Sequence, residues 1–299
     1  MHKILEKRRL SNDVERGQDV FYFKVMAPEI ARNRKAGQFI IFQIDDNYGE
    51  RVPLTIADAN AEEGWIAIVF QTVGASTFKL AADFDVGDEI PVIVGPLGKP
   101  THIEKFTEAD GKPGTVICVG GGIGVAPLFP IVQANHAIGN HVITIIGARS
   151  KHLLILEEEM RANSDELIVV TDDGTYGRKG LVTEPLKELC EKLNPAAREI
   201  VSIGPGIMMK FCVETARPFN VPITTSLNTI MIDGTGMCGC CRVTVGGETK
   251  FVCVDGPEFD GYKVDFDNMM KRMAAFKPRE QADYQKAKER DHKCRIGLN

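Results

Sequence analysis

The chain has 299 residues, about twice the usual size of one domain, so two or three folded units are expected. Its composition, 43% hydrophobic and 26% charged, is ordinary for a globular protein. The net charge of -5 argues against nucleic acid as the main partner, because binding to phosphates depends on clustered Lys and Arg.

Residues 1–17 contain no apolar core long enough for a signal peptide, and no run of about 18 apolar residues could span a bilayer. We therefore expect a cytoplasmic protein without a membrane span. In a reducing compartment, its eight cysteines are expected to be thiols or metal ligands rather than disulfides. Four of them gather between Cys238 and Cys253. The other four are scattered and are expected to be inert: Cys118, Cys190, Cys212 and Cys294.

Hydrophobic periodicity divides the chain near residues 105–114. Short β-rich runs from Val20 to about Gly98 are separated by Pro, Gly and Asp, which predicts a small antiparallel barrel. Beyond this boundary, apolar strands alternate with amphipathic helices, which predicts a parallel sheet covered on both faces. We predict a β-barrel domain over residues 1–108 and an α/β nucleotide-binding domain over residues 109–225.

Two further segments complete the chain. Residues 226–260 hold the clustered cysteines and form a small module of their own. Residues 261–299 have a helical composition, rich in alanine and in alternating charges. Pro278 is expected to break or kink this C-terminal helical extension, because proline cannot donate a backbone hydrogen bond within a helix.

A glycine-rich turn, "VGGGIGVAP" (Val119 to Pro127), follows a strand-like run and leads into an apolar helix. Without Cβ atoms, its glycines let backbone N–H groups approach a pyrophosphate, which the helix dipole also favours. The predicted nucleotide contacts are Gly120, Gly121, Gly122 and Gly124. The alternative is a tight turn that serves packing alone. Because strand, glycines and helix come in the order that phosphate binding requires, nucleotide binding is favoured.

Two stretches of the predicted barrel could also contact a ligand. In "VGASTFKL", Gly74, Ser76 and Thr77 precede an apolar helical run and offer donors suited to phosphate. In "ERVPLTIAD", Arg51 places a cation close to the hydroxyl of Thr55. Either stretch, taken alone, favours a helix cap or an exposed strand end over a ligand contact.

The order of the motifs resembles the ferredoxin-NADP reductase superfamily: "RVPLTIAD", "VGASTFKL", "GPLG", "GGGIGVAP", "TDDG", "IGPG" and then a cysteine cluster. The resemblance covers nearly the whole chain up to Gly256. It is to the branch that contains the electron-transfer subunit of dihydroorotate dehydrogenase. Within that branch, "SLNTIMIDGTGMCGCCRV" resembles the small (alpha) subunit of the electron-bifurcating NADH-dependent ferredoxin:NADP oxidoreductase. This resemblance implies an FAD-binding barrel, an NAD-binding domain and a C-terminal [2Fe-2S] site.

The resemblance also implies roles for individual residues. The flavin-ring motif matches Arg51, Pro53, Leu54 and Thr55, and the FAD pyrophosphate motif matches Gly74, Ser76 and Thr77. The usual arginine of the superfamily stands three residues before the Ser or Thr, a position held here by Val52. Gly120 to Pro127 match the nicotinamide nucleotide loop, which Asp172 and Asp173 are expected to help line.

The cysteine cluster fits the plant-type [2Fe-2S] spacing C-x4-C-x2-C with a distant fourth ligand, if an aspartate takes the first position. The implied metal ligands are Asp233, Cys238, Cys241 and Cys253. Cys240 is then a bystander, or a substitute if this register is wrong by one residue. A structural zinc site built from three Cys and one Asp is the alternative.

These implications predict an oxidoreductase subunit that relays electrons among NAD(H), FAD and a [2Fe-2S] cluster. Its expected partner is a larger flavin and iron-sulfur subunit, which in the bifurcating complex also connects it to ferredoxin. One alternative is the electron-transfer subunit of a dihydroorotate dehydrogenase, and another is a non-catalytic nucleotide-binding regulator with a structural zinc. The resemblance favours NADH, whereas Arg149, Ser150 and Lys151 follow the second strand, where readers of a 2′-phosphate often lie.

Overall fold

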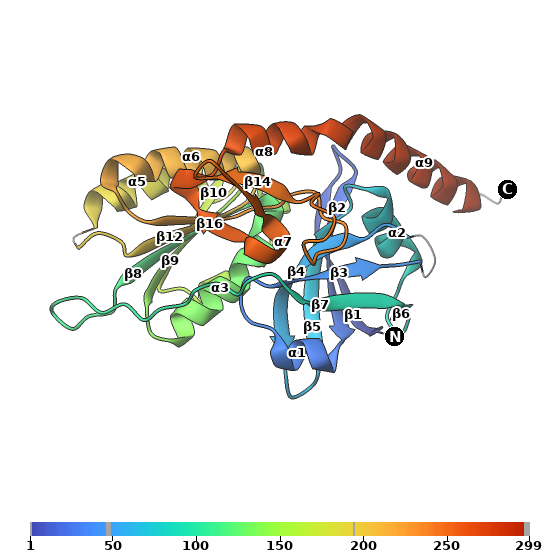
Figure 1. Cartoon of the computed structure of the whole chain (residues 1–299), viewed down its shortest axis with the longest axis horizontal. Coiled ribbons are helices and arrows are strands. Elements are labelled where there is room, and N and C mark those ends of the chain that lie inside the picture. The colour runs from blue at the N-terminus through green and yellow to red at the C-terminus, as the bar shows by residue number, and fades with distance from the viewer. Residues whose placement is uncertain (1, 46–48, 194, 296–299) are drawn as a thin grey trace.

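The computed structural model describes residues 2–45, 49–193 and 195–295. Two sheets lie side by side, and the C-terminal helices run across both of them (Figure 1). The predicted fold class, an antiparallel β domain followed by a parallel-sheet domain and a small cysteine module, is confirmed. No helix in the described part of the chain is long and apolar enough to cross a bilayer.

In the described residues, seven antiparallel strands form the N-terminal sheet in the order β6-β1-β2-β5-β4-β3-β7. Its interior is filled by large apolar side chains, including Phe23, Phe42 and Phe70. The elements of this domain are β1 (His2–Asp13), β2 (Gln18–Met26), α1 (Pro28–Asn33), β3 (Phe39–Gln43), β4 (Val52–Asn60), β5 (Trp65–Gln71), α2 (Ala75–Asp83), β6 (Glu89–Ile90) and β7 (Val92–Leu97).

Strand β1 lies before the predicted β-rich runs, which begin at Val20. Its sequence, "HKILEKRRLSND", is charged and lacks a clean alternation of apolar and polar residues. Register shifts on either side of Lys7 explain this, since each shift marks a bulge that changes which residues face inward. The second shift, between Arg9 and Ser11, leaves Ser11 and Asp13 buried at the end of the strand.

The second sheet has the order β11-β10-β9-β8-β12-β13-β16 among the described residues, and it is parallel except for its last strand. Alternate residues of β8 face opposite sides: Val116 and Cys118 pack with α3, whereas Ile117 and Val119 pack with α5 and α6. The elements are β8 (Thr115–Gly121), η1 (Gly122–Gly124), α3 (Val125–Ala137), β9 (His141–Ala148), η2 (Lys151–Leu153), α4 (Glu157–Ala162), β10 (Glu166–Thr171), β11 (Arg178–Lys179), α5 (Thr183–Lys192), β12 (Glu199–Ile203), α6 (Gly206–Ala216), η3 (Arg217–Phe219) and β13 (Ile223–Ser226).

The cysteine module is joined to this parallel sheet by one strand of its own, since β16 (Glu258–Asp260) pairs antiparallel with β13. The module also contains β14 (Arg242–Val245), β15 (Glu248–Phe251) and α7 (Val252–Asp255). The C-terminal extension consists of η4 (Gly261–Lys263), α8 (Phe266–Met273), η5 (Ala274–Phe276) and α9 (Lys277–Arg295). Pro278 lies in the first turn of α9, so the predicted break at this proline is confirmed. The proposed domain boundaries stay predictions.

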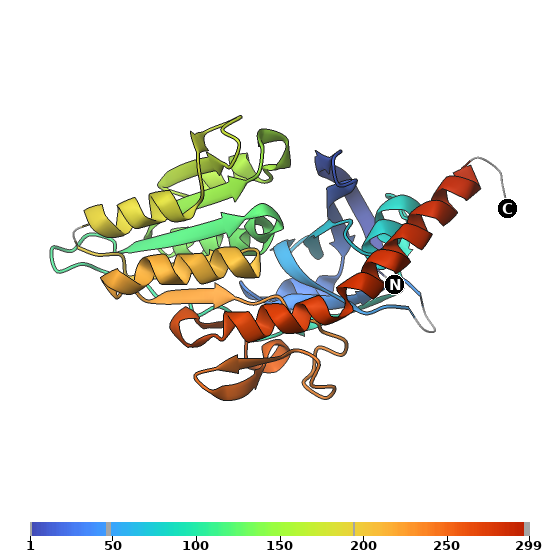
Figure 2. The ribbon, with the colours of Figure 1, turned by 90° about the horizontal axis from the view of Figure 1, so that it is seen from above.

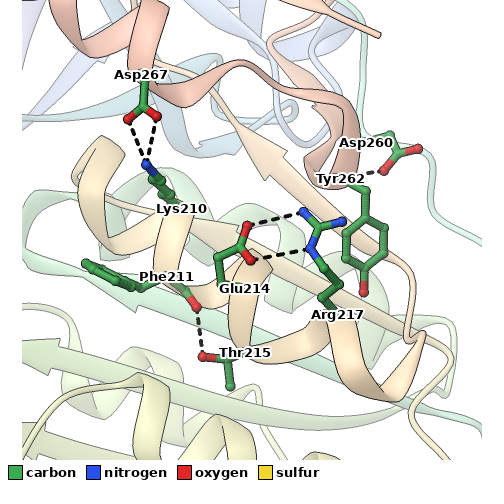
Figure 3. A network of polar contacts seen from close by, with 8 residues as sticks. All are labelled: Lys210, Phe211, Glu214, Thr215, Arg217, Asp260, Tyr262 and Asp267. Atoms are coloured by element: carbon green, nitrogen blue, oxygen red, sulfur yellow. Dashed lines mark hydrogen bonds and ion pairs between the residues drawn. The ribbon is translucent and has the colours of Figure 1, made fainter.

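Polar contacts tie the C-terminal extension to helix α6 and to the η3 turn that follows it (Figure 3). Lys210 donates from Nζ to both carboxylate oxygens of Asp267, at 2.7 and 2.9 Å, and the guanidinium of Arg217 lies 5.0 Å from the ring centre of Tyr262. Farther along, α9 crosses to the barrel and packs beside α2 (Figure 2). There the hydroxyl of Tyr284 donates to the carbonyl of Gly17 at 2.9 Å. The extension therefore connects both domains.

Candidate functional site

The glycine turn between β8 and α3 is built for close approach. Gly122 has a φ of +55°, which favours glycine, and nothing lies within 4 Å of the position that a Cβ would take. Gly124, in contrast, lies so close to the next βα loop that a Cβ would stand 2.4 Å from the carbonyl oxygen of Ile203. One glycine therefore exposes backbone to open space, and the other lets two strand ends meet.

Beside this turn lies a cavity of about 500 Å³, here called the nucleotide cavity, at the C-terminal ends of β8, β9 and β10. Its wall includes Gly121, Gly122 and Asp172. Burial and the charge of Asp173 raise the pKa of Asp172, while Arg149 opposes the shift. Asp173 is not among the described residues that line this cavity, and it accepts hydrogen bonds from Thr175, at 2.9 Å from N and 2.7 Å from Oγ1. Of the two predicted aspartates, only Asp172 is placed at the cavity.

A second cavity, of about 270 Å³, separates the two sheets and is here called the interdomain cavity. The barrel contributes Pro53, Leu54 and Thr55 of β4, as the sequence motif implied. The opposite wall is the glycine turn and the loop after β12. Ile123 and Pro205 line both cavities, so the two are neighbours across a shared wall. A dinucleotide in the first cavity could therefore reach a ring held in the second.

The other predicted flavin contacts are placed less directly. Arg51 is exposed immediately before β4 and is not among the described residues that line the interdomain cavity. Thr77 caps its own helix, since its Oγ1 accepts from Gly74 N at 3.2 Å and donates to Gly74 O at 3.1 Å. Ser76 donates to Glu50 Oε2 at 2.5 Å. What α2 offers a phosphate is therefore mainly its first-turn N–H groups, which have no acceptor within the helix.

Asp233 organises the exposed half of the cysteine loop. Its carboxylate accepts hydrogen bonds from the backbone of Thr235, Met237 and Cys238, at 3.2, 2.9 and 3.1 Å. Cys238 also donates from Sγ to Asp233 Oδ1 at 3.4 Å. Burial alone would raise the pKa of Asp233, but the hydrogen bonds from Thr235 and Cys238 outweigh it and lower the pKa. The carboxylate is thus held ionised beside an exposed thiol, the form in which it can bind a metal.

Cys241 and Cys253 form the other half. Both are 1% exposed, and their sulfur atoms are 3.2 Å apart. Strands β14 and β15 position them, with Cys241 just before the first strand and Cys253 just after the second. Burial first, and then the thiol of Cys241, raises the pKa of Cys253 to about 12, while the backbone N–H of Gly236 acts in the opposite direction. The Gly236 contact places the Asp233 loop next to this buried pair.

The structure therefore places the four predicted ligands in two pairs, and the backbone of Gly236, which contacts Cys253, links the loop of the first pair to the second. Among the described residues, no group of three or more His, Cys, Asp or Glu side chains is placed to hold a metal ion. Two pairs fit a two-iron cluster better than one zinc ion, because each iron of a [2Fe-2S] centre takes two protein ligands whereas structural zinc takes four. Cys240 is half-buried, and its pKa is raised by burial and by the neighbouring thiol of Cys238.

Several residues that shape these cavities escaped the sequence interpretation. The tip of the β1–β2 hairpin adds Ser11, Asp13 and Arg16 to the nucleotide cavity. Helix α8 adds Met269 to the interdomain cavity, and the segment before the cysteines adds Met231. No motif marks them, because long-range packing alone brings these segments to the cavities.

The cysteine module matches a family model described as the iron-sulfur cluster binding domain of dihydroorotate dehydrogenase B, over residues 228–265. Over 287 residues, the chain is 45% identical to a protein of Thermotoga maritima described as a homolog of the dihydroorotate dehydrogenase B (NAD(+)) electron transfer subunit. This match covers 96% of the chain and 95% of the relative. The chain belongs to the dihydroorotate dehydrogenase B electron-transfer subunit family. The chain is also 47% identical to an uncharacterized protein of Clostridium beijerinckii. This match covers 94% of the chain and 92% of the relative.

One solved structure confirms the predicted resemblance to the electron-bifurcating enzyme. A structure of an NADH-dependent reduced ferredoxin-NADP oxidoreductase, described for its flavin-based electron bifurcation, matches with a TM-score of 0.86 and 41% identity. The match covers 96% of the present chain and 97% of the chain in that structure. A ferredoxin NADP+ reductase from Neisseria gonorrhoeae, with bound FAD and NADP, has a TM-score of 0.54 at 18% identity, covers 73% of this chain and 90% of its own, and shows the fold alone.

Proposed function

We propose that this chain passes electrons between NAD(H), FAD and a [2Fe-2S] cluster, as the smaller subunit of an electron-bifurcating NADH-dependent ferredoxin:NADP oxidoreductase. The observation that carries the proposal is the alignment of three sites. The nucleotide cavity shares a wall with the interdomain cavity, and Met231 of the interdomain cavity is two residues from Asp233. Two residues of chain span at most about 7 Å, so the flavin position and the cysteine module are close.

Each site offers its cofactor a suitable surface. Gly120 to Gly124 would hold the nucleotide pyrophosphate, and Gly122 faces open space there. Pro53, Leu54 and Thr55 would hold the flavin ring against the glycine turn, in a cavity lined mainly by apolar side chains. A bound flavin supplies the ability to accept a hydride from NADH and to release electrons singly.

At the cysteine module, the Asp233 and Cys238 pair would bind one iron, and the Cys241 and Cys253 pair the other. The buried pair lies on the side of the module that packs into the protein core. The exposed pair faces outward, so electrons can leave or enter there. Gly234 packs on Ile41 and Leu97 of the barrel, which holds the exposed loop against the domain that would carry the flavin.

A partner subunit at the exposed pair is supported by apolar side chains around it. Met237 is 89% exposed, and Ile232 and Val254 are 48% and 38% exposed. Exposed apolar side chains that gather at one place commonly mark a protein interface. The proposed partner is a larger flavin and iron-sulfur oxidoreductase subunit, which would connect this chain to ferredoxin. The family's dihydroorotate dehydrogenase relatives favour a second candidate, in which the partner is a dihydroorotate dehydrogenase.

The test is the cofactor content and the electron donor of the chain purified with its native partner under anaerobic conditions. We expect one FAD and one [2Fe-2S] cluster per chain, and faster flavin reduction by NADH than by NADPH in stopped-flow measurements. A colourless zinc protein, or a released flavin that proves to be FMN, would overturn the proposal. The second candidate would be selected if the purified complex oxidised dihydroorotate and did not reduce NADP+ with reduced ferredoxin.

A further inference from the structure

The nucleotide cavity is closed on one side by the barrel, not by the nucleotide-binding domain. The bulge between Arg9 and Ser11 turns the end of β1 so that Ser11 and Asp13 become buried there. Bulges of this kind often re-aim side chains next to functional sites. The 3₁₀ turn η2, which follows β9, packs directly against this strand.

Asp13 forms an ion pair with Arg149 across the domain boundary, from Oδ2 to Nη2. The carboxylate is 2% exposed, whereas the Arg149 side chain is 38% exposed. Asp13 Oδ1 also accepts a hydrogen bond from the backbone of Arg16 at 3.2 Å. A carboxylate buried this deeply requires a cationic partner, so Asp13 fixes the position of Arg149 rather than the reverse.

Ser11 supplies an independent sign that this wall meets a ligand. The residue is 5% exposed and lines the cavity, and its hydroxyl has no hydrogen-bond partner among the described residues. Buried hydroxyls are nearly always hydrogen-bonded, so an unbonded one at a cavity wall points to a group that the cavity receives. Ser11 and Asp13 lie on the same buried face of β1.

Arg149 lies at a position where nucleotide-binding domains distinguish NAD(H) from NADP(H). It follows β9, the strand beside the one that carries the glycine turn, and an arginine near the ribose accommodates the 2′-phosphate of NADP in related sites. Here its guanidinium is already bound by Asp13. Lys151, the other basic residue of this loop, lies over the ring of Tyr176 with its Nζ 4.8 Å from the ring centre.

We propose that Asp13 selects NAD(H) over NADP(H), because it holds Arg149 in an ion pair at the wall of the nucleotide cavity. A 2′-phosphate entering this wall meets a carboxylate and an arginine whose charge is already balanced. The 2′-hydroxyl of NAD(H) carries no charge, so the same wall accepts it without repulsion. This inference rests on the proposed function and adds a specificity-determining residue to it.

The test compares adenosine 2′,5′-bisphosphate with 5′-AMP, which differ only in the 2′-phosphate, by calorimetry on the flavin-loaded protein. The wild-type protein is expected to bind 5′-AMP at least as tightly as it binds the bisphosphate. Asp13→Asn should bind the bisphosphate about tenfold more tightly relative to 5′-AMP, which corresponds to about 1.4 kcal/mol. The same variant should raise kcat/KM for NADPH relative to NADH. Asp13→Asn/Arg149→Met should lose both gains, because the freed guanidinium is gone.

Asp19→Asn is the matched control. It removes a carboxylate from the same hairpin, where Asp19 pairs with Arg9 away from the cavity, and should leave both ratios unchanged. If Asp13→Asn does not fold, Asp13→Ser takes its place, since a hydroxyl can still accept from Arg16 N. Unchanged ratios in the Asp13 variants, with NADH still reducing the flavin, would overturn the inference alone. A wild type that binds neither 5′-AMP nor NADH would overturn the proposed function with it.

Discussion

The two halves of the cysteine module hold their side chains by different means. Cys241 and Cys253 are sealed in the core, with sulfur atoms in contact and two strands behind them. Asp233 and Cys238 lie on an exposed loop whose shape depends on hydrogen bonds to one carboxylate. Packing fixes the first pair, and polar contacts fix the second.

This difference implies different tolerance to change. A buried ligand has no room for a substitute and no water to replace it, whereas an exposed ligand can be exchanged if the loop keeps its shape. The same difference is consistent with Asp233 at a position that a thiolate usually holds in this spacing. The exposed half is open to solvent, which makes it the half at which the proposed ligand chemistry can vary.

The largest effect is expected at the buried half. Cys253→Ser should remove nearly all iron from the purified protein, because a buried hydroxyl, a much weaker iron ligand, replaces the thiolate. Iron per chain and the visible spectrum measure this loss. Cys190→Ser is the control, since it changes another buried thiol on α5 and should keep full iron. Iron retained by Cys253→Ser would remove this residue from the ligand set.

At the exposed half, Asp233→Ala should lower iron occupancy without abolishing it, and Asp233→Cys should retain the cluster. We expect Asp233→Cys to lower the midpoint potential by on the order of 100 mV, because thiolate donates more charge to iron than carboxylate and non-thiolate ligands raise the potential. Iron analysis and a potentiometric EPR titration measure both effects.

Asp233→Asn separates the two roles of this aspartate. The amide oxygen can still accept hydrogen bonds from the loop but is a weaker iron ligand. If iron occupancy in Asp233→Asn equals that of wild type, Asp233 serves only the loop. If it falls as far as in Asp233→Ala, the carboxylate is needed for the metal itself.

The exposed half should also carry the partner contact. Met237→Glu places a charge at an apolar side chain that is 89% exposed, so it should weaken binding of the partner subunit by about tenfold and leave iron unchanged. Calorimetry or analytical ultracentrifugation of the two subunits measures it. Val86→Glu, at an exposed valine of the barrel, is the control. Equal affinity of the two variants would place the interface elsewhere.

The sequence predicted the regular parts of this molecule well. Gly120 and Gly121 end β8, and Gly122 and Gly124 lie between β8 and α3 as expected, because the turn is local and needs residues without Cβ atoms. Pro53, Leu54 and Thr55 reach the interdomain cavity because a single strand carries all three. In each case, neighbours along the chain determine the structure.

Contacts between distant segments could not be predicted in this way. Asp13 and Arg149 are far apart in sequence, and the bulged strand β1 hides its pattern of inward-facing residues. The hydroxyl of Thr77 could equally cap its helix or bind phosphate, and in the structure it caps. The contact of α9 with the barrel through Tyr284 likewise depends on tertiary packing, which the polar sequence of this helix does not predict.

The smallest effect is expected for Cys240→Ser, which tests whether the two-pair arrangement is complete. Cys240 lies beside Cys238, but it also lines a small cavity against α8 with Met269 and Arg272. Because the four predicted ligands already form two pairs, iron content and potential should remain those of wild type. The measurements are iron per chain and the EPR titration, made beside the Asp233 variants. If Cys240→Ser loses iron while Asp233→Ala keeps both iron and potential, Cys240 is the fourth ligand and Asp233 is only a loop residue.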